Sequence, residues 1–142
     1  MGWRYLFFSV EGRISRKPFW IGTGVLFAVG LASLFLESHL DAPRPAAILG
    51  LALLYPEFAV TLKRARDRDM SLMLPALLLV VGVVIYALDF FGFTSTDAFE
   101  PYDLFALCYL LLSIYLLVVL GFFKGTPGPN RFGPNPLETR IS

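Results

Sequence analysis

The chain contains few of the residues on which catalytic and metal sites depend. It has one cysteine and one histidine among 142 residues, and only 16% of its residues are charged. A single cysteine, Cys108, excludes a disulfide within the chain and argues against a cysteine-based metal cluster. The sequence also lacks a phosphate-binding P-loop, the HExxH zinc motif and the GxSxG nucleophile motif. We therefore expect no enzyme activity, no bound metal and no cofactor.

The chain also has no large excess of positive or negative charge, since its net charge is +1 at pH 7. No general affinity for nucleic acid follows from so small a charge. What the chain has in quantity is apolar sequence: 56% of its residues are hydrophobic, and four apolar runs approach the roughly 20 residues that a helix needs to cross a bilayer. We predict an all-α membrane protein with transmembrane helices at about residues 18–36, 46–62, 72–93 and 104–123.

The basic residues alternate with these runs. Eleven of the twelve Lys and Arg residues lie in three stretches, residues 1–17, 63–71 and 124–142, and only Arg44 lies elsewhere. Basic residues in short loops are retained on the cytoplasmic side of a membrane. We therefore predict one domain, an antiparallel bundle of four helices in the bacterial inner (plasma) membrane, with both termini and a Gly/Pro-rich tail in the cytoplasm.

The N-terminal basic stretch ends directly before the first apolar run, with Arg13, Arg16 and Lys17. If this stretch is helical, Arg13 and Arg16 share one face at a spacing of three residues. Two interpretations are open. The residues either anchor the helix on the cytoplasmic side, beside aromatic residues at the headgroup boundary, or bind lipid phosphates or an acidic group of a partner.

The middle stretch alternates arginine with aspartate, and Asp67 is expected to pair with neighbouring arginines such as Arg64 and Arg66 or to cap the next helix. Glu57 lies six residues before Lys63, about 9 Å along a helix axis, and so below the membrane interface. A carboxylate at that depth is costly unless it is paired, protonated or hydrated. It would form an interhelical hydrogen bond, pair with Lys63 or Arg64, or relay protons or cations.

The tail contains three glycines and four prolines within residues 125–136, which excludes helix and favours turns. At its centre, Asn130 and Arg131 would either present backbone amides and a guanidinium as an anion-binding nest or belong to a rigid structural loop packed under the bundle.

Three motifs carry a resemblance to a known family. They are GRISRKPFW (residues 12–20), Pro56 followed by KRARD (residues 63–67), and GPNRFGPNP (residues 128–136). In this order around four apolar runs they resemble the "domain of unknown function 805" family of small bacterial inner-membrane proteins. Arg66 stands where that family usually has histidine, and Asp69 and Leu72 stand where it has glycines. The resemblance implies the fold and the location but no activity.

Our working hypothesis joins the motifs at the cytoplasmic face. The cluster would act as a structural clasp or as a binding site for an anionic lipid headgroup or a protein partner, and it would comprise Arg13, Arg16, Arg64, Arg66, Asp67, Asn130 and Arg131. The alternative is a small transporter or channel subunit that uses Glu57 within a homo-oligomer. The expected partners are the lipid bilayer and a second copy or another membrane protein.

Overall fold

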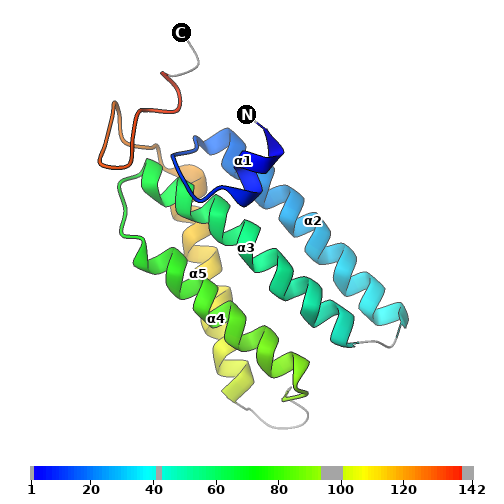
Figure 1. Cartoon of the computed structure of the whole chain (residues 1–142). Coiled ribbons are helices and arrows are strands. Elements are labelled where there is room, and N and C mark those ends of the chain that lie inside the picture. The colour runs from blue at the N-terminus through cyan, green and yellow to red at the C-terminus, as the bar shows by residue number, and fades with distance from the viewer. Residues whose placement is uncertain (1, 41–42, 94–100, 139–142) are drawn as a thin grey trace.

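The computed structural model describes residues 2–40, 43–93 and 101–138. Over these residues the protein has five helices and no strand, which confirms the all-α prediction (Figure 1). The helices are α1 (Trp3–Phe8), α2 (Arg16–Leu40), α3 (Pro43–Asp67), α4 (Met73–Phe90) and α5 (Pro101–Phe122). The last four residues of the predicted tail, among them Arg140, lie outside the described residues.

Three helices are long and apolar enough to cross a membrane, namely Arg16–Phe35 within α2, Met73–Phe90 and Pro101–Phe122. They coincide with the predicted spans at residues 18–36, 72–93 and 104–123. The remaining predicted span, residues 46–62, lies within α3, which does not meet the same standard of length and apolar composition in the described chain. The structure thus supports three spans by composition.

The position of α3 explains why it needs less apolar sequence. It packs against each of the four other helices, and no other helix does so. Its buried residues include Ala47, Leu54, Ala59 and Val60, and a side chain at Gly22 of α2 would touch Val60 at 3.2 Å. Ile48 and Tyr55 in the first half of α3 are 57% and 47% exposed, whereas residues 59–65 are buried. Where α3 is covered by protein, its polar residues can bond to neighbouring chain instead of facing hydrocarbon.

The outward surfaces of the other long helices are apolar. Only 11%, 22% and 17% of the spanning windows of α2, α4 and α5 are buried within the protein. Large side chains such as Phe27, Val80 and Leu111 are 67%, 58% and 58% exposed. Soluble monomers rarely expose continuous apolar surface on this scale. The protein is therefore a membrane protein.

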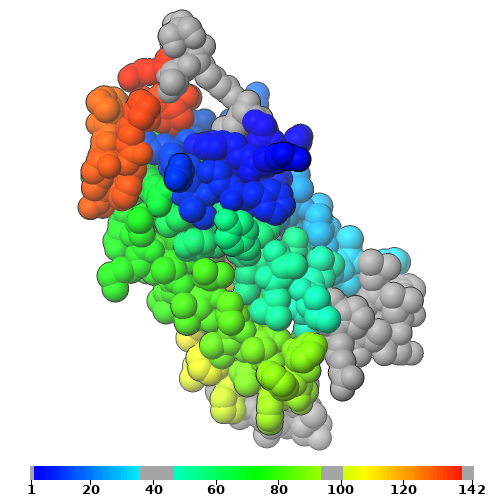
Figure 2. All heavy atoms as spheres, in the orientation of Figure 1, coloured from blue at the N-terminus to red at the C-terminus, as the bar shows by residue number. Residues whose placement is uncertain are grey.

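Several segments gather at one end of the bundle. The start of α2, the end of α3, the end of α5 and the tail meet there, and α1 lies across α3 at the same end (Figures 1 and 2). The six residues of α1 were not predicted, because so short a helix shows no periodicity. The buried Lys63 donates hydrogen bonds to the carbonyl oxygens of Tyr5 and of Leu6, the latter at 2.8 Å.

The connection from α1 to α2, residues 9–15, is not helical. Gly12 has φ +79°, a conformation that favours glycine, and the Tyr5 hydroxyl occupies the place where a β-carbon of residue 12 would lie. The condition under which Arg13 and Arg16 would share a helix face is therefore not met. Arg16 begins α2, whereas Arg13 is turned into the protein and is 5% exposed.

Candidate functional site

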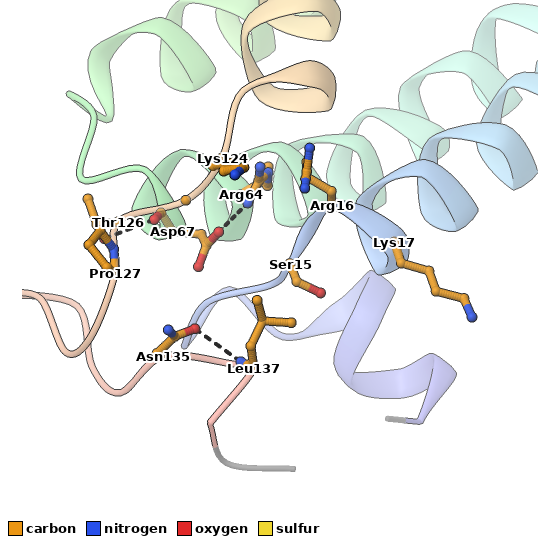
Figure 3. A pocket seen from close by; sticks show the side chains of 11 residues that line it. Ser15, Arg16, Lys17, Arg64, Asp67, Lys124, Thr126, Pro127, Asn135 and Leu137 are labelled. Atoms are coloured by element: carbon orange, nitrogen blue, oxygen red, sulfur yellow. Dashed lines mark hydrogen bonds and ion pairs between the residues drawn. The ribbon is translucent and has the colours of Figure 1, made fainter. Parts of the chain in front are cut away.

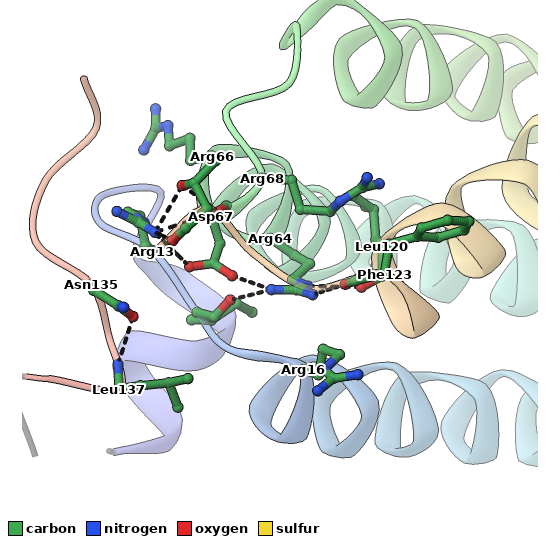
Figure 4. Close-up of polar contacts among 12 residues, drawn as sticks. Arg13, Arg16, Arg64, Arg66, Asp67, Arg68, Leu120, Phe123, Asn135 and Leu137 are labelled. Carbon is green, nitrogen blue, oxygen red and sulfur yellow. Dashed lines mark hydrogen bonds and ion pairs between the residues drawn. The ribbon is translucent and has the colours of Figure 1, made fainter. Parts of the chain in front are cut away.

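Asp67, the last residue of α3, is buried between two arginines at the gathered end of the bundle (Figure 4). Its carboxylate pairs with Arg13 at 3.1 Å and with Arg64, which precedes it by three residues. Because residues three apart on a helix share a face, the sequence of α3 alone brings Arg64 to Asp67. We call Arg13, Arg64 and Asp67 the Asp67 cluster.

Arg13 joins three parts of the chain. Its Nε donates to Asp67 Oδ1 at 3.2 Å. Its Nη1 donates to the carbonyl oxygens of Gly128 and Gly133 at 3.1 and 2.9 Å, and its Nη2 donates to that of Thr126 at 3.1 Å. The N-terminal connection, the end of α3 and the tail therefore meet on one guanidinium, whose donors are all occupied by protein.

Arg64 binds the C-terminal end of α5. Its Nε donates to Leu120 O and its Nη2 to Phe123 O, each at 2.7 Å. The last four carbonyl groups of a helix have no partner within it. In α5, side chains from elsewhere in the chain donate hydrogen bonds to the three that remain besides Leu120 O. Arg68 donates to Val119 O at 2.8 Å, Trp20 to Gly121 O at 3.1 Å and Arg16 to Phe122 O at 3.3 Å. Cationic groups here also favour the negative end of the helix dipole.

The charges of the Asp67 cluster depend on one another. Burial raises the pKa of the Asp67 carboxyl, and the guanidiniums of Arg64 and Arg13 oppose that rise because they favour the carboxylate. Burial lowers the pKa of Arg64, and Asp67 opposes that change. Removing either member would leave a buried charge without compensation.

The centre of the tail forms a tight turn closed by paired backbone bonds between Asn130 and Gly133. The side chain of Asn130 donates to Arg66 O at 2.8 Å and accepts the Phe132 amide at 2.9 Å. The tail thus turns carbonyl oxygens toward Arg13, while the amides of Thr126, Asn130, Phe132 and Gly133 are used within the protein. This geometry favours the structural-loop interpretation over the anion nest.

The remaining predicted site residues lie around the cluster. Arg66 donates to Val10 O, and Arg16 is exposed beside the end of α5. Arg131 pairs with Asp69 at 2.7 Å, with side chains 60% and 43% exposed, and does not contact Asp67. Asp69 has φ +55°, in the left-handed region that favours glycine, and it stands where the resemblance led us to expect glycine.

A cleft of about 590 Å³ opens beside the cluster. Figure 3 shows Arg16, Arg64 and Lys124 on one side of it and Asn135 and Leu137 of the tail on the other. Lys17 lies at its rim with its side chain turned away. Asp67 is the one acidic residue lining the cleft among the described residues, and it is already paired with two arginines. The cleft is therefore positively charged.

Glu57 lies apart from this end. Its Oε2 accepts a hydrogen bond from Tyr109 of α5 at 2.8 Å. Within the described residues no ion pair joins Glu57 to Lys63 or Arg64. Of the alternatives for Glu57, the structure shows the interhelical hydrogen bond.

Some residues of the site were missed. Thr126 contacts both Arg13 and the carbonyl of Asp67, the latter through its amide at 2.8 Å. Gly125 lies so close to Asp67 that a β-carbon would come within 2.7 Å of the carboxyl carbon. The glycines and prolines of this segment signal a turn, but no local pattern marks Gly125 and Thr126 as the residues that contact Asp67 and Arg13.

The comparisons with known proteins agree with the sequence resemblance. The chain is 34% identical over 140 residues to "Uncharacterized protein YiiR" of Escherichia coli K12, covering 94% of this chain and 89% of that protein, and equally to the protein of that name from strain O157:H7. It is 33% identical over 93 residues to "Uncharacterized transporter GSU1016" of Geobacter sulfurreducens, covering 60% of this chain and 17% of that protein. No solved structure matches the chain.

The model of the family described as "Protein of unknown function (DUF805)" matches residues 7–134. That range includes the first two motifs, residues 128–134 of the third, and each of the described spans. The chain therefore belongs to the DUF805 family of proteins of unknown function.

Proposed function

We propose that this protein is an inner-membrane protein with four spans and cytoplasmic termini, whose cytoplasmic end binds a phosphate group in the positively charged cleft. The Asp67 cluster is the structural clasp that shapes this end. The role proposed is binding and not catalysis.

The packing of α3 supports the proposed fourth span. The helix α3 runs antiparallel to α2 and α4 and contacts both along the bundle (Figure 1). Its 25 residues extend about 37 Å, so residues 46–62 share the depth of the apolar parts of its neighbours. The distribution of basic residues supports a cytoplasmic orientation for the end that holds the Asp67 cluster.

The binding proposal rests on a difference between two groups of basic residues at this end of the bundle, one bonded by the protein and one not. Arg13 and Arg64 are buried and bonded throughout by protein groups. Lys17 and Lys124 are exposed and make no hydrogen bond or ion pair within the described residues, and Arg16 makes one bond at 3.3 Å. At this end of the bundle, the basic residues that hold the structure together are thus different from those that are free to bind an anion.

The place of the cleft favours a lipid phosphate. Arg16 and Lys17 begin a spanning segment and Lys124 follows another, so the free cations stand at the level of headgroups. Beside them, a groove along Trp20, Ile21 and Phe122 offers apolar surface to a lipid chain. Basic residues near a membrane surface attract anionic lipids by about 1 kcal/mol each.

Lipid binding can be tested on the purified full chain. We expect native mass spectrometry from mixed phosphatidylglycerol and phosphatidylcholine vesicles to show preferential retention of the anionic lipid. The Arg16→Gln/Lys124→Gln variant should lose that preference, whereas Arg4→Gln, at an exposed cation outside the cleft, should keep it. Equal retention of both lipids by the unmodified protein would refute the proposal, and competition by inorganic phosphate would show that a free anion suffices.

Transport is the second candidate. It is favoured by Glu57 at membrane depth and by the name of the relative "Uncharacterized transporter GSU1016", which this chain matches over part of its length. The test is proton or cation flux in liposomes. Flux that Glu57→Gln abolishes would support a transporter or channel subunit, and absence of flux in the unmodified protein would remove this candidate.

A further inference from the structure

A second cavity lies within the bundle, distinct from the cleft. It occupies about 330 Å³ between α2, α3 and α5, and α4 contributes to its wall. Most of the lining is apolar, as at Leu26, Leu53 and Leu117. Five polar side chains also line it: Thr23, Glu57, Thr61, Tyr86 and Ser113. An apolar cavity with a few convergent polar groups is the usual form of a small-molecule site.

The cavity opens toward lipid. Phe27 of α2 and Ile114 of α5 line it and are 67% and 50% exposed, so its mouth lies on the outer surface between these helices. Phe27 follows Arg16 by eleven residues, which is about 16 Å along the helix axis. The hydrocarbon core is about 30 Å thick. The mouth is therefore near the middle of the bilayer, and a ligand would enter from the hydrocarbon.

The polar wall is incompletely satisfied. Glu57 receives one hydrogen bond, from Tyr109 to its Oε2 at 2.8 Å, and has no ion pair within the described residues. The Ser113 hydroxyl oxygen is buried and has no hydrogen-bond partner in the described chain. Polar groups left without partners away from water are costly. A ligand that brings hydrogen bonds would stabilise this wall.

We propose that the cavity binds an uncharged, bilayer-soluble molecule with a long apolar body and a terminal hydroxyl group. The hydroxyl donates to the Glu57 carboxyl, and the apolar body lies along the leucine-lined wall toward the mouth between Phe27 and Ile114. A charged ligand is disfavoured because it would have to cross hydrocarbon to reach the mouth. This proposal does not depend on the phosphate site of the cytoplasmic cleft.

Two photoreactive probes test the proposal. One is a diazirine-bearing hexadecanol, and the other is hexadecane bearing the same diazirine. The full chain in phosphatidylcholine vesicles is irradiated with each, and labelled peptides are located by mass spectrometry. One hydrogen bond to a carboxyl group corresponds to about tenfold in occupancy, so we expect the alcohol to label the cavity residues of α2, α3 and α5 about tenfold more than the alkane.

The glycines of α2 offer a matched pair of variants. Gly30 lines the cavity, and a β-carbon there would meet no atom within 4 Å. Gly24 has the same open surroundings but is outside the lining. Gly30→Leu should fill the cavity and remove alcohol labelling, Gly24→Leu should retain it, and Glu57→Leu should reduce the alcohol to the alkane level. Equal labelling by both probes in the unmodified protein, or full labelling of Gly30→Leu, would overturn the proposal.

Discussion

Asp67 and Asp69 stand two residues apart, and each pairs with arginine, but they belong to different environments. The carboxylate of Asp67 is 5% exposed and meets two buried guanidiniums. That of Asp69 is 43% exposed and meets one arginine that is itself 60% exposed. The first joins the N-terminal connection to the end of α3 in the interior, and the second joins the α3–α4 loop to the tail at the surface.

The contrast separates structural charge from surface charge. Breaking a buried pair leaves an uncompensated charge and typically costs about 3–5 kcal/mol. An exposed pair contributes about 0–1 kcal/mol because water and salt screen it. Residues of the same type in one short segment should therefore differ severalfold in their effect on stability.

The largest effect is expected for Asp67→Asn. This change preserves size but leaves Arg13 and Arg64 buried without an anion, so the free energy of unfolding should fall by about 3–5 kcal/mol. Denaturant unfolding in one fixed detergent, followed by tryptophan fluorescence, measures it.

The control is Asp69→Asn, because asparagine also tolerates the left-handed conformation at this position. It should change stability by less than about 1 kcal/mol. Comparable losses in the two variants would abolish the distinction between the two aspartates.

An intermediate effect is expected for Gly125→Ala. The added methyl group would meet the Asp67 carboxyl and, at 3.0 Å, the Asp67 carbonyl oxygen, so the tail must shift. Overpacking of this kind costs about 1–3 kcal/mol, and trypsin should cleave after Arg131 faster than in the unmodified chain. As a control, alanine at Gly2, which has open surroundings, should leave the cleavage rate as it is.

Lys63 extends the comparison to a buried charge that forms no ion pair within the described residues. Burial lowers the pKa of Lys63 to about 8 from 10.5, and Arg66 adds to the effect. Between these values the unfolded chain binds the proton and the folded chain does not, so stability should rise as pH increases from about 8 to 10.5. Unfolding across this range should show that rise relative to Lys63→Met, and parallel pH profiles for the two proteins would contradict it.

The smallest effect is expected for Arg131→Ala. It removes the exposed pair with Asp69, and the loss should be below about 1 kcal/mol and weaker at high salt. Thermal unfolding at two salt concentrations measures it. A loss as large as that of Asp67→Asn would place Arg131 in the structural core of this end.

Much of the architecture follows from local sequence. Apolar runs and Gly/Pro content predict the spanning helices and the turns of the tail, and the three-residue spacing of Arg64 and Asp67 predicts their contact. The composition of α3 did not reveal that this helix packs against the four others. Its central position depends on how the bundle assembles, which no local pattern records.

The rest depends on long-range contact. Nothing in the alternation of arginine and aspartate distinguishes Asp67 from Asp69. The distinction arises because α3 ends at Asp67, on the face shared with Arg64, and the chain then turns at Asp69. Arg13 reaches this face from 54 residues away. Helical spacing does not apply to Arg13, because the chain is not helical between residues 9 and 15.

Hydrogen exchange of the tail amides tests the central claim that Asp67, and not Asp69, holds the tail to the bundle. The Thr126 amide bonds to Asp67 O, and the Asn130 and Gly133 amides close the turn whose carbonyls bind Arg13. We predict slow exchange of these amides in the unmodified protein and in Asp69→Asn, and fast exchange in Asp67→Asn. Fast exchange in all three proteins, or unchanged slow exchange in Asp67→Asn, would contradict the claim.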